Sequence, residues 1–129
     1  MPGRARPWHA WRHPRTMKLL IIDDHAGARQ LIREIVARPG DRVCECATGE
    51  EALAVAPGFG ADFATVDLML GGVSGFATMR ALQQQSPGTR LVVVSSYSEP
   101  ELRLAALALG AVAFVPKERL TELREVVHP

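Results

Sequence analysis

Residues 19–24 read Leu-Leu-Ile-Ile-Asp-Asp, four apolar side chains followed directly by two acids. A short apolar run of this kind is typical of a buried β-strand. The acid pair marks the point where the strand ends. Because Met17 opens the run, we expect the folded domain to span residues 17–129.

Four further apolar runs follow, separated by segments with helical periodicity. Apolar residues at Leu31, Ile32, Ile35 and Val36, for example, share one face of a helix. Thr48 with Glu51, and Ser98 with Glu101, predict capping boxes at two helix starts, while Ser74 or Gly75 starts a third. Helix breaks are predicted at Pro39-Gly40, Pro57 to Gly60, Pro87-Gly88 and Gly110. The predicted strands cover residues 19–22, 43–47, 63–66, 91–94 and 112–115.

Five strands therefore alternate with five helices, the last helix lined by Leu120, Leu123 and Val127. This alternation is typical of a parallel sheet with helices on both faces. Right-handed crossovers then favour a doubly wound α/β fold.

Composition excludes several classes of protein. The 129 residues, 47% of them hydrophobic, suit one compact domain, and no apolar run is long enough to span a bilayer. Two cysteines cannot form a disulfide scaffold, so we expect a reducing, cytoplasmic location.

The formal net charge of +1 conceals an asymmetry along the chain. Residues 1–16 hold four arginines and no acid, which leaves 11 basic and 14 acidic residues in the remainder. We interpret residues 1–16 as a basic, disordered extension. The acidic remainder gives no reason to expect nucleic-acid binding.

Polar residues directly follow most of the predicted strands, and the carboxyl ends of parallel strands share one edge of a sheet. Three carboxylates at this edge would need more positive charge than one lysine supplies. A site with oxygen ligands and few protein groups suits Mg²⁺. A metal, a lysine, a hydroxyl and a free carboxylate together form a phosphoryl-transfer site. The residues expected to converge are Asp23, Asp24, Asp67, Ser95 and Lys117.

Residues 17–127 resemble the receiver domain of bacterial two-component response regulators. The motifs that carry the resemblance are LLIIDDH at 19–25, ATGEEAL at 47–53, VDLML at 66–70 with Gly75, VVVSS at 92–96 and GAVAFVPK at 110–117. The resemblance implies a flavodoxin-like sheet, as in the chemotaxis regulators. It also implies a phosphoacceptor that assists its own phosphorylation and has no separate substrate.

Residue roles carry over from this resemblance one position at a time. Asp67 would be the phosphoacceptor, with Lys117 and Ser95 contacting the phosphoryl group. Mg²⁺ would be bound by Asp24, Asp67 and the backbone carbonyl of Met69 directly, and by Asp23 through a water. Ser95 and Phe114 would be the switch residues.

The resemblance also implies the partners. A sensor histidine kinase or a phosphotransfer protein would deliver the phosphoryl group, and the output would be a protein–protein contact. The predicted helix that ends at Leu109 is apolar nearly all round, which suggests a target or homodimer surface formed with the fifth strand and fifth helix. We expect a receiver without an output domain after Pro129.

Two other functions fit part of the pattern. One is a small Mg²⁺-dependent phosphatase with an aspartyl nucleophile, although such enzymes typically carry a second aspartate where this chain has Met69. The other is a receiver-shaped scaffold that is never phosphorylated, which the intact set of site residues disfavours. We interpret His25 as a loop residue, and Cys44 and Cys46 as small side chains on one strand face.

Overall fold

A computed structural model describes Pro14 and residues 16–129, so most of the predicted extension over residues 1–16 lies outside the described residues. The strands are β1 (Lys18–Ile22), β2 (Arg42–Cys46), β3 (Phe63–Val66), β4 (Arg90–Ser95) and β5 (Ala113–Pro116). The helices are α1 (Ala26–Val36), α2 (Gly49–Phe59), α3 (Gly75–Gln85), α4 (Pro100–Ala108) and α5 (Leu123–Val127), with a 3₁₀ segment η2 (Lys117–Glu122) before α5.

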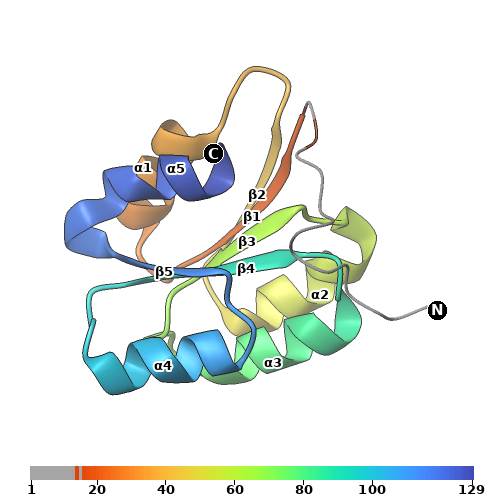
Figure 1. Cartoon of the computed structure of the whole chain (residues 1–129). Helices are drawn as coiled ribbons and strands as arrows, with labels where there is room; N and C mark the ends of the chain where they lie inside the picture. The colour runs from red at the N-terminus through yellow and green to blue at the C-terminus, as the bar shows by residue number, and fades with distance from the viewer. Residues whose placement is uncertain (1–13, 15) are drawn as a thin grey trace.

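The five strands form one parallel sheet in the order β2-β1-β3-β4-β5. Helices α1 and α5 cover one face, and α2, α3 and α4 cover the other (Figure 1). Strand order reverses between β1 and β3, which in open α/β sheets is where ligands bind at the carboxyl edge. The predicted doubly wound fold is confirmed.

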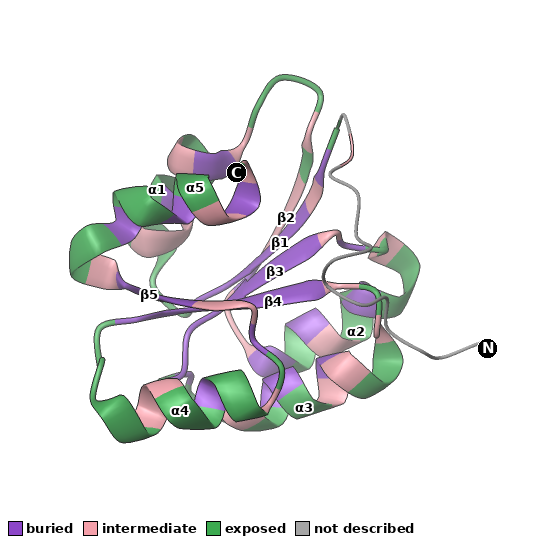
Figure 2. Cartoon of the chain, in the orientation of Figure 1, coloured by how far each residue is buried: buried purple, intermediate pink, exposed green. Residues whose placement is uncertain are grey.

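Each sheet face has its own hydrophobic core, and β3 and β4 between them are buried throughout, whereas Cys46 is the one buried residue of the edge strand β2 (Figure 2). Alternate residues of β1 divide between the two: Leu20 and Ile22 face α2 and α3, whereas Leu19 and Ile21 face α1 and α5. The apolar run at residues 19–22 is therefore buried on both sides, as a central parallel strand requires.

Two predictions about helix ends are wrong. Helix α2 continues through Pro57 to Phe59 and stops at Gly60, whose φ of 68° and N–H bond to the Ala56 carbonyl close the last turn. A proline so near the end removes one hydrogen bond, while buried Ala52 and Ala56 keep the turn packed. The second capping box does not form either, because Pro100 occupies the first helical position of α4 and Glu99 becomes the N-cap without a side-chain bond.

The other predicted helix starts are confirmed. Thr48 Oγ1 accepts from the Glu51 N–H at 3.1 Å, and Ser74 Oγ accepts from the Ala77 N–H at 3.2 Å. The last predicted helix is interrupted, since Leu120 belongs to η2 and α5 begins only at Leu123. In the described part of the chain, no helix is long and apolar enough to cross a membrane.

Candidate phosphoryl-transfer site

The register of β1 and β3 brings two predicted site residues together. Ile22 pairs with Val66, so Asp23 and Asp67 follow neighbouring strands at the same level. Backbone bonds extend the ladder beyond the strands: the Asp67 N–H donates to the Ile22 carbonyl and the Asp23 N–H donates to the Cys46 carbonyl, both at 3.0 Å. The backbone positions of both acids are therefore fixed by the sheet.

Lys117 completes this arrangement from the residue directly after β5, on the far side of β4. Its Nζ lies 2.7 Å from Asp23 Oδ2 and 3.0 Å from Asp67 Oδ2. Both carboxylates are buried, with 1% and 4% of the residue exposed. Burial and a shared cation hold these two acids in fixed rotamers.

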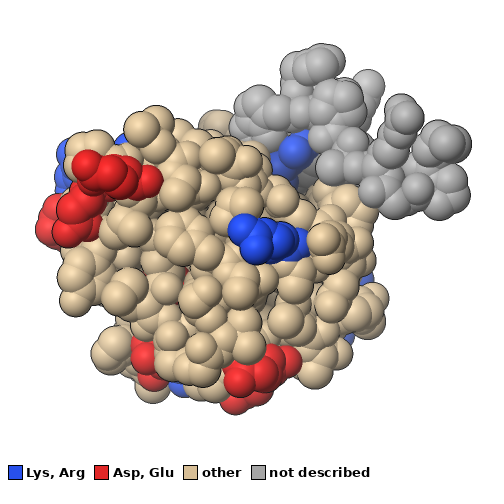
Figure 3. All heavy atoms as spheres, turned by 90° about the horizontal axis from the view of Figure 1, so that it is seen from below, with Lys and Arg blue, Asp and Glu red and all other residues tan. Residues whose placement is uncertain are grey.

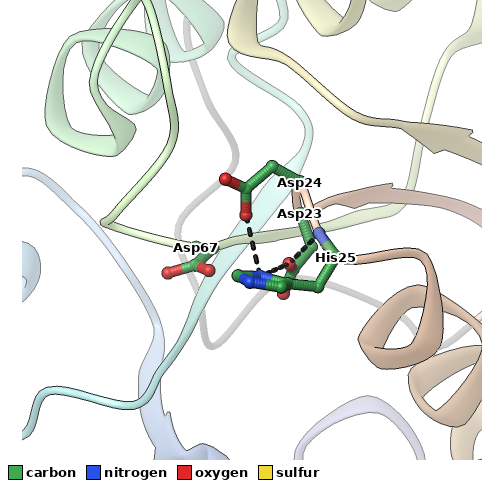
Figure 4. A group of neighbouring side chains, drawn as sticks. All are labelled: Asp23, Asp24, His25 and Asp67. Carbon is green, nitrogen blue, oxygen red and sulfur yellow. Dashed lines mark hydrogen bonds and ion pairs between the residues drawn. The ribbon is translucent and has the colours of Figure 1, made fainter.

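Asp24 and His25 are the exposed members of the cluster that Figure 4 draws. The Asp24 side chain is 38% exposed, and its Oδ1 lies 2.9 Å from His25 Nδ1, which is also 3.4 Å from Asp23 Oδ1. One ligand atom each from Asp23, Asp24, His25 and Asp67 can be chosen so that all lie within 4.8 Å of one another. His25 is a loop residue, as predicted, but sequence reasoning missed that its ring contacts both acids.

Met69 lies in the loop after β3, and Ser95 is the last residue of β4. The Met69 N–H donates to Asp67 Oδ1 at 3.0 Å, while the Met69 side chain is 54% exposed. Ser95 is fully buried and its Oγ accepts from the Tyr97 N–H at 3.1 Å. Ser95 thus lies at the same sheet edge as Asp67, one strand away, with its hydroxyl bonded to the loop that follows β4.

Phe114 lies deeper, inside β5, and is 7% exposed. The Arg103 guanidinium from α4 stands over its ring, 4.9 Å from the centroid, a distance at which the cation is attracted to the ring face. The ring is therefore inside the core rather than at the surface.

Lys117 and Cys46 have pKa values raised by their surroundings. Burial acts to lower the pKa of Lys117, but hydrogen bonds and charges from Asp23 and Asp67 outweigh it and raise that pKa above 10.5. Burial raises the pKa of the Cys46 thiol from 9.0 to about 12, and neighbouring Cys44 adds to the rise. Both groups retain their protons in the folded chain at pH values where the unfolded chain loses them.

We therefore expect stability to fall on the alkaline side. Between pH 9 and 12 the unfolded chain releases the Cys46 proton and the folded chain does not, so the free energy of unfolding falls by up to about 1.4 kcal/mol per pH unit. Lys117 adds a further loss above pH 10.5. Denaturant titrations measure the free energy of unfolding at pH 7 and at pH 10. The loss between these two pH values should shrink in Cys46→Ala but persist in Cys44→Ala. An equal difference in Cys46→Ala and the unmodified chain would contradict this.

The fold and the cluster define a class of protein: doubly wound α/β domains with carboxylates and a lysine at the carboxyl edge of the sheet. A family model described as the response regulator receiver domain matches residues 19–128. The chain belongs to this family, and its fold and acidic cluster are those of a receiver domain of a two-component response regulator.

Curated relatives include larger proteins. The chain is 37% identical over 116 residues to protein-glutamate methylesterase/protein-glutamine glutaminase 5 of Myxococcus xanthus, covering 83% of this chain and 33% of that protein. It is 37% identical over 113 residues to the transcriptional regulatory protein YhcZ of Bacillus subtilis, covering 86% and 52%. The chain thus spans between a third and about half of these relatives. It covers 90% of sporulation initiation phosphotransferase F of Bacillus subtilis, at 25% identity over 111 residues and 85% of this chain.

Solved structures show the same architecture. The response regulator domain of Thermotoga maritima CheB matches with a TM-score of 0.78 and 26% identity, over 88% of this chain and 94% of that one. A Burkholderia pseudomallei response regulator, whose structure holds a phosphorylated aspartic acid, a calcium ion and citrate, matches with a TM-score of 0.78 and 26% identity, over 88% and 66%.

Proposed function

We propose that Asp67 accepts a phosphoryl group from a phosphohistidine on a sensor histidine kinase or a phosphotransfer protein. The observation that carries the proposal is the environment of its carboxylate. Asp67 is buried, held by the Lys117 ammonium and the Met69 N–H, and lies beside the acid pair Asp23 and Asp24. The phosphorylated aspartic acid in the Burkholderia structure supports the same chemistry in a related protein.

The donor set fits a divalent cation. Asp23, Asp24 and Asp67 bring three negative charges and Lys117 brings one positive charge, and oxygen atoms dominate the cluster. Mg²⁺ favours such ligands. We propose that Asp24, Asp67 and the Met69 carbonyl bind it directly and that Asp23 binds through a water. When bound, the ion would neutralise charge on the phosphoryl oxygens.

The chain's own residues then divide the transfer step between them. An Asp67 oxygen forms a bond to phosphorus as the bond from phosphorus to the histidine nitrogen breaks, and the imidazole leaves with its electron pair and takes a proton from water. Lys117 is already within hydrogen-bond distance of Asp67 and would pair with a phosphoryl oxygen. The Ser95 hydroxyl would exchange its bond with the Tyr97 N–H for one to the phosphoryl group.

The proposed output is a protein–protein contact rather than turnover of a separate substrate. Movement of Ser95 and Phe114 would change the face formed by α4, β5 and α5. On α4, Leu104 is 67% exposed and Leu107 is 44% exposed, which supports a surface for a target protein or a second copy. Figure 3 shows the adjoining lower face of the molecule, where charged side chains are sparse. Cys44 and Cys46 are free thiols, which supports a cytoplasmic location.

The direct test is an intact mass after incubation with Mg²⁺ and acetyl phosphate. We expect one phosphoryl adduct on the unmodified chain and none on Asp67→Asn, because an amide oxygen is too weak a nucleophile to replace the carboxylate. Asp62→Asn is the matched control, since Asp62 lies at the opposite end of β3 and accepts from the Lys18 N–H. An adduct that persists in Asp67→Asn would contradict the assignment of the nucleophile. No adduct on the unmodified chain would favour the scaffold function.

A further inference from the structure

Glu45 on β2 is held by two arginines from α1. Arg29 Nε donates to Glu45 Oε1 at 3.1 Å, and Arg33 Nε donates to Glu45 Oε2 at 2.9 Å. We call Arg29, Arg33 and Glu45 the Glu45 cluster. The Arg29 side chain is 17% exposed and the Arg33 side chain is 45% exposed, so Arg29 is the inner member of the cluster.

Arg29 makes one contact that Arg33 does not. Its Nη1 donates to the backbone carbonyl of Asp23 at 2.6 Å. That carbonyl belongs to the peptide that joins Asp23 to Asp24, so the guanidinium contacts the β1–α1 connection directly at the acid pair. Glu45 holds the same guanidinium from the other side and fixes its orientation.

The remaining polar atoms of Asp23 are also engaged. Its N–H donates to the Cys46 carbonyl, its Oδ1 accepts from the His25 N–H at 2.9 Å, and its Oδ2 pairs with Lys117. The Asp23 carbonyl oxygen is the last of these polar atoms, and Arg29 is its partner. This contact therefore sets the tilt of the peptide plane between Asp23 and Asp24. That tilt directs the Cα–Cβ bond of Asp24, whose carboxylate is the exposed acid of the cluster.

We propose that Arg29 is a positioning residue for the divalent-metal site, acting through the Asp23–Asp24 peptide with Glu45 as its anchor. The inference rests on the proposed metal binding by Asp24. Arg29 does not touch the metal or the phosphoryl group in this scheme. It holds Asp24 in the direction from which its carboxylate completes the site.

Electrostatics and positioning predict opposite results when Arg29 is removed. Loss of a positive charge near three carboxylates would strengthen cation binding if charge alone mattered. Loss of the hydrogen bond to the Asp23 carbonyl would weaken cation binding, because Asp24 would have to be ordered when the ion binds. The sign of the change therefore separates the two effects.

The experiment measures the Mg²⁺ dissociation constant of the full chain by calorimetry. Arg29→Met keeps an unbranched stem that reaches about as far as Nε and removes every donor, and we expect it to weaken Mg²⁺ binding by roughly tenfold. Arg33→Met is the matched control, because it loses the same kind of bond to Glu45 from the same helix but has no bond to Asp23. We expect its dissociation constant to stay within about twofold of the unmodified chain.

Two further readouts separate positioning from general destabilisation. The Asp24 amide resonance should shift in Arg29→Met and not in Arg33→Met, because this N–H shares a peptide with the bonded carbonyl. Arg29→Lys, which retains one cationic donor, should recover part of the lost affinity.

Equal or tighter Mg²⁺ binding in Arg29→Met, or an equal loss in Arg33→Met, would overturn the inference while leaving the proposed metal site intact. A lack of Mg²⁺ binding by the unmodified chain would overturn both.

Discussion

Lys117→Met is expected to destabilise the metal-free protein and, at the same time, to tighten Mg²⁺ binding. The Lys117 ammonium is the shared cation of Asp23 and Asp67, at 2.7 and 3.0 Å, and both acids are buried. Removing the ammonium leaves the buried negative charge of these two acids without compensation. We expect a loss of about 3 kcal/mol, at the low end for buried pairs because Lys117 is partly exposed.

Mg²⁺ should reverse most of this loss. Without the lysine, a divalent cation is the remaining source of positive charge at the cluster, so its dissociation constant should fall by about tenfold or more. Phosphorylation of Asp67 should nevertheless fall sharply, since the variant lacks the ammonium proposed to pair with a phosphoryl oxygen. Stability and catalysis are thus predicted to respond to Mg²⁺ in different ways.

The chain offers a matched control for this substitution. Lys18 is the other of the chain's two lysines and opens β1 at the opposite edge of the sheet. Lys18→Met should leave Mg²⁺ affinity and phosphorylation unchanged. Denaturant titrations with and without Mg²⁺ measure the loss of stability and the stabilisation that Mg²⁺ binding supplies. If Lys117→Met were as stable as the unmodified chain without Mg²⁺, or bound Mg²⁺ more weakly, the account of the cluster would be wrong.

The sequence predicts the sheet well because the sheet depends on a repeated local rule. Each predicted strand is an apolar run that lies between two helical layers, and the structure places all five within about one residue of the predicted bounds. Residues 112–115 and 43–47, for example, become β5 at Ala113–Pro116 and β2 at Arg42–Cys46. Helix ends are predicted less well, because packing of Ala56 outweighs the local preference of Pro57, and Pro100 moves the start of α4 away from Ser98.

That Asp23, Asp67 and Lys117 meet at one edge could be predicted, because the carboxyl ends of parallel strands share one edge of a sheet. The distances between them depend on the strand order, which the sequence pattern does not give. Arg29 was missed for a physical reason: its contact with the Asp23 carbonyl depends on a long side chain that reaches back from the helix to the loop. The two residues are six positions apart, a spacing that has no meaning in helix or strand periodicity. Glu45, which fixes that side chain, comes from another strand.

The site also depends on close backbone packing at Gly75. This glycine is the first residue of α3, it is buried, and its N–H donates to the Leu68 carbonyl at 3.2 Å. A Cβ at this position would overlap the backbone oxygen of Asp67 and the Cα of Leu68. These are backbone atoms held by the β1–β3 ladder, so they cannot move aside as the end of a flexible side chain could.

Gly75→Ala is therefore expected to destabilise the protein by about 3 kcal/mol, at the upper end of the usual cost of overpacking. Because the displaced peptide carries Asp67, Mg²⁺ binding should weaken as well. Gly27→Ala is the matched control: Gly27 lies in α1 with no atom within 4 Å of an added Cβ, and alanine there should stabilise the helix by about 0.5–1 kcal/mol. Denaturant unfolding of the two variants should thus move the midpoint in opposite directions. A Gly75→Ala variant as stable as the unmodified chain would show that α3 can withdraw from β3 without cost, and the site would not depend on their close approach.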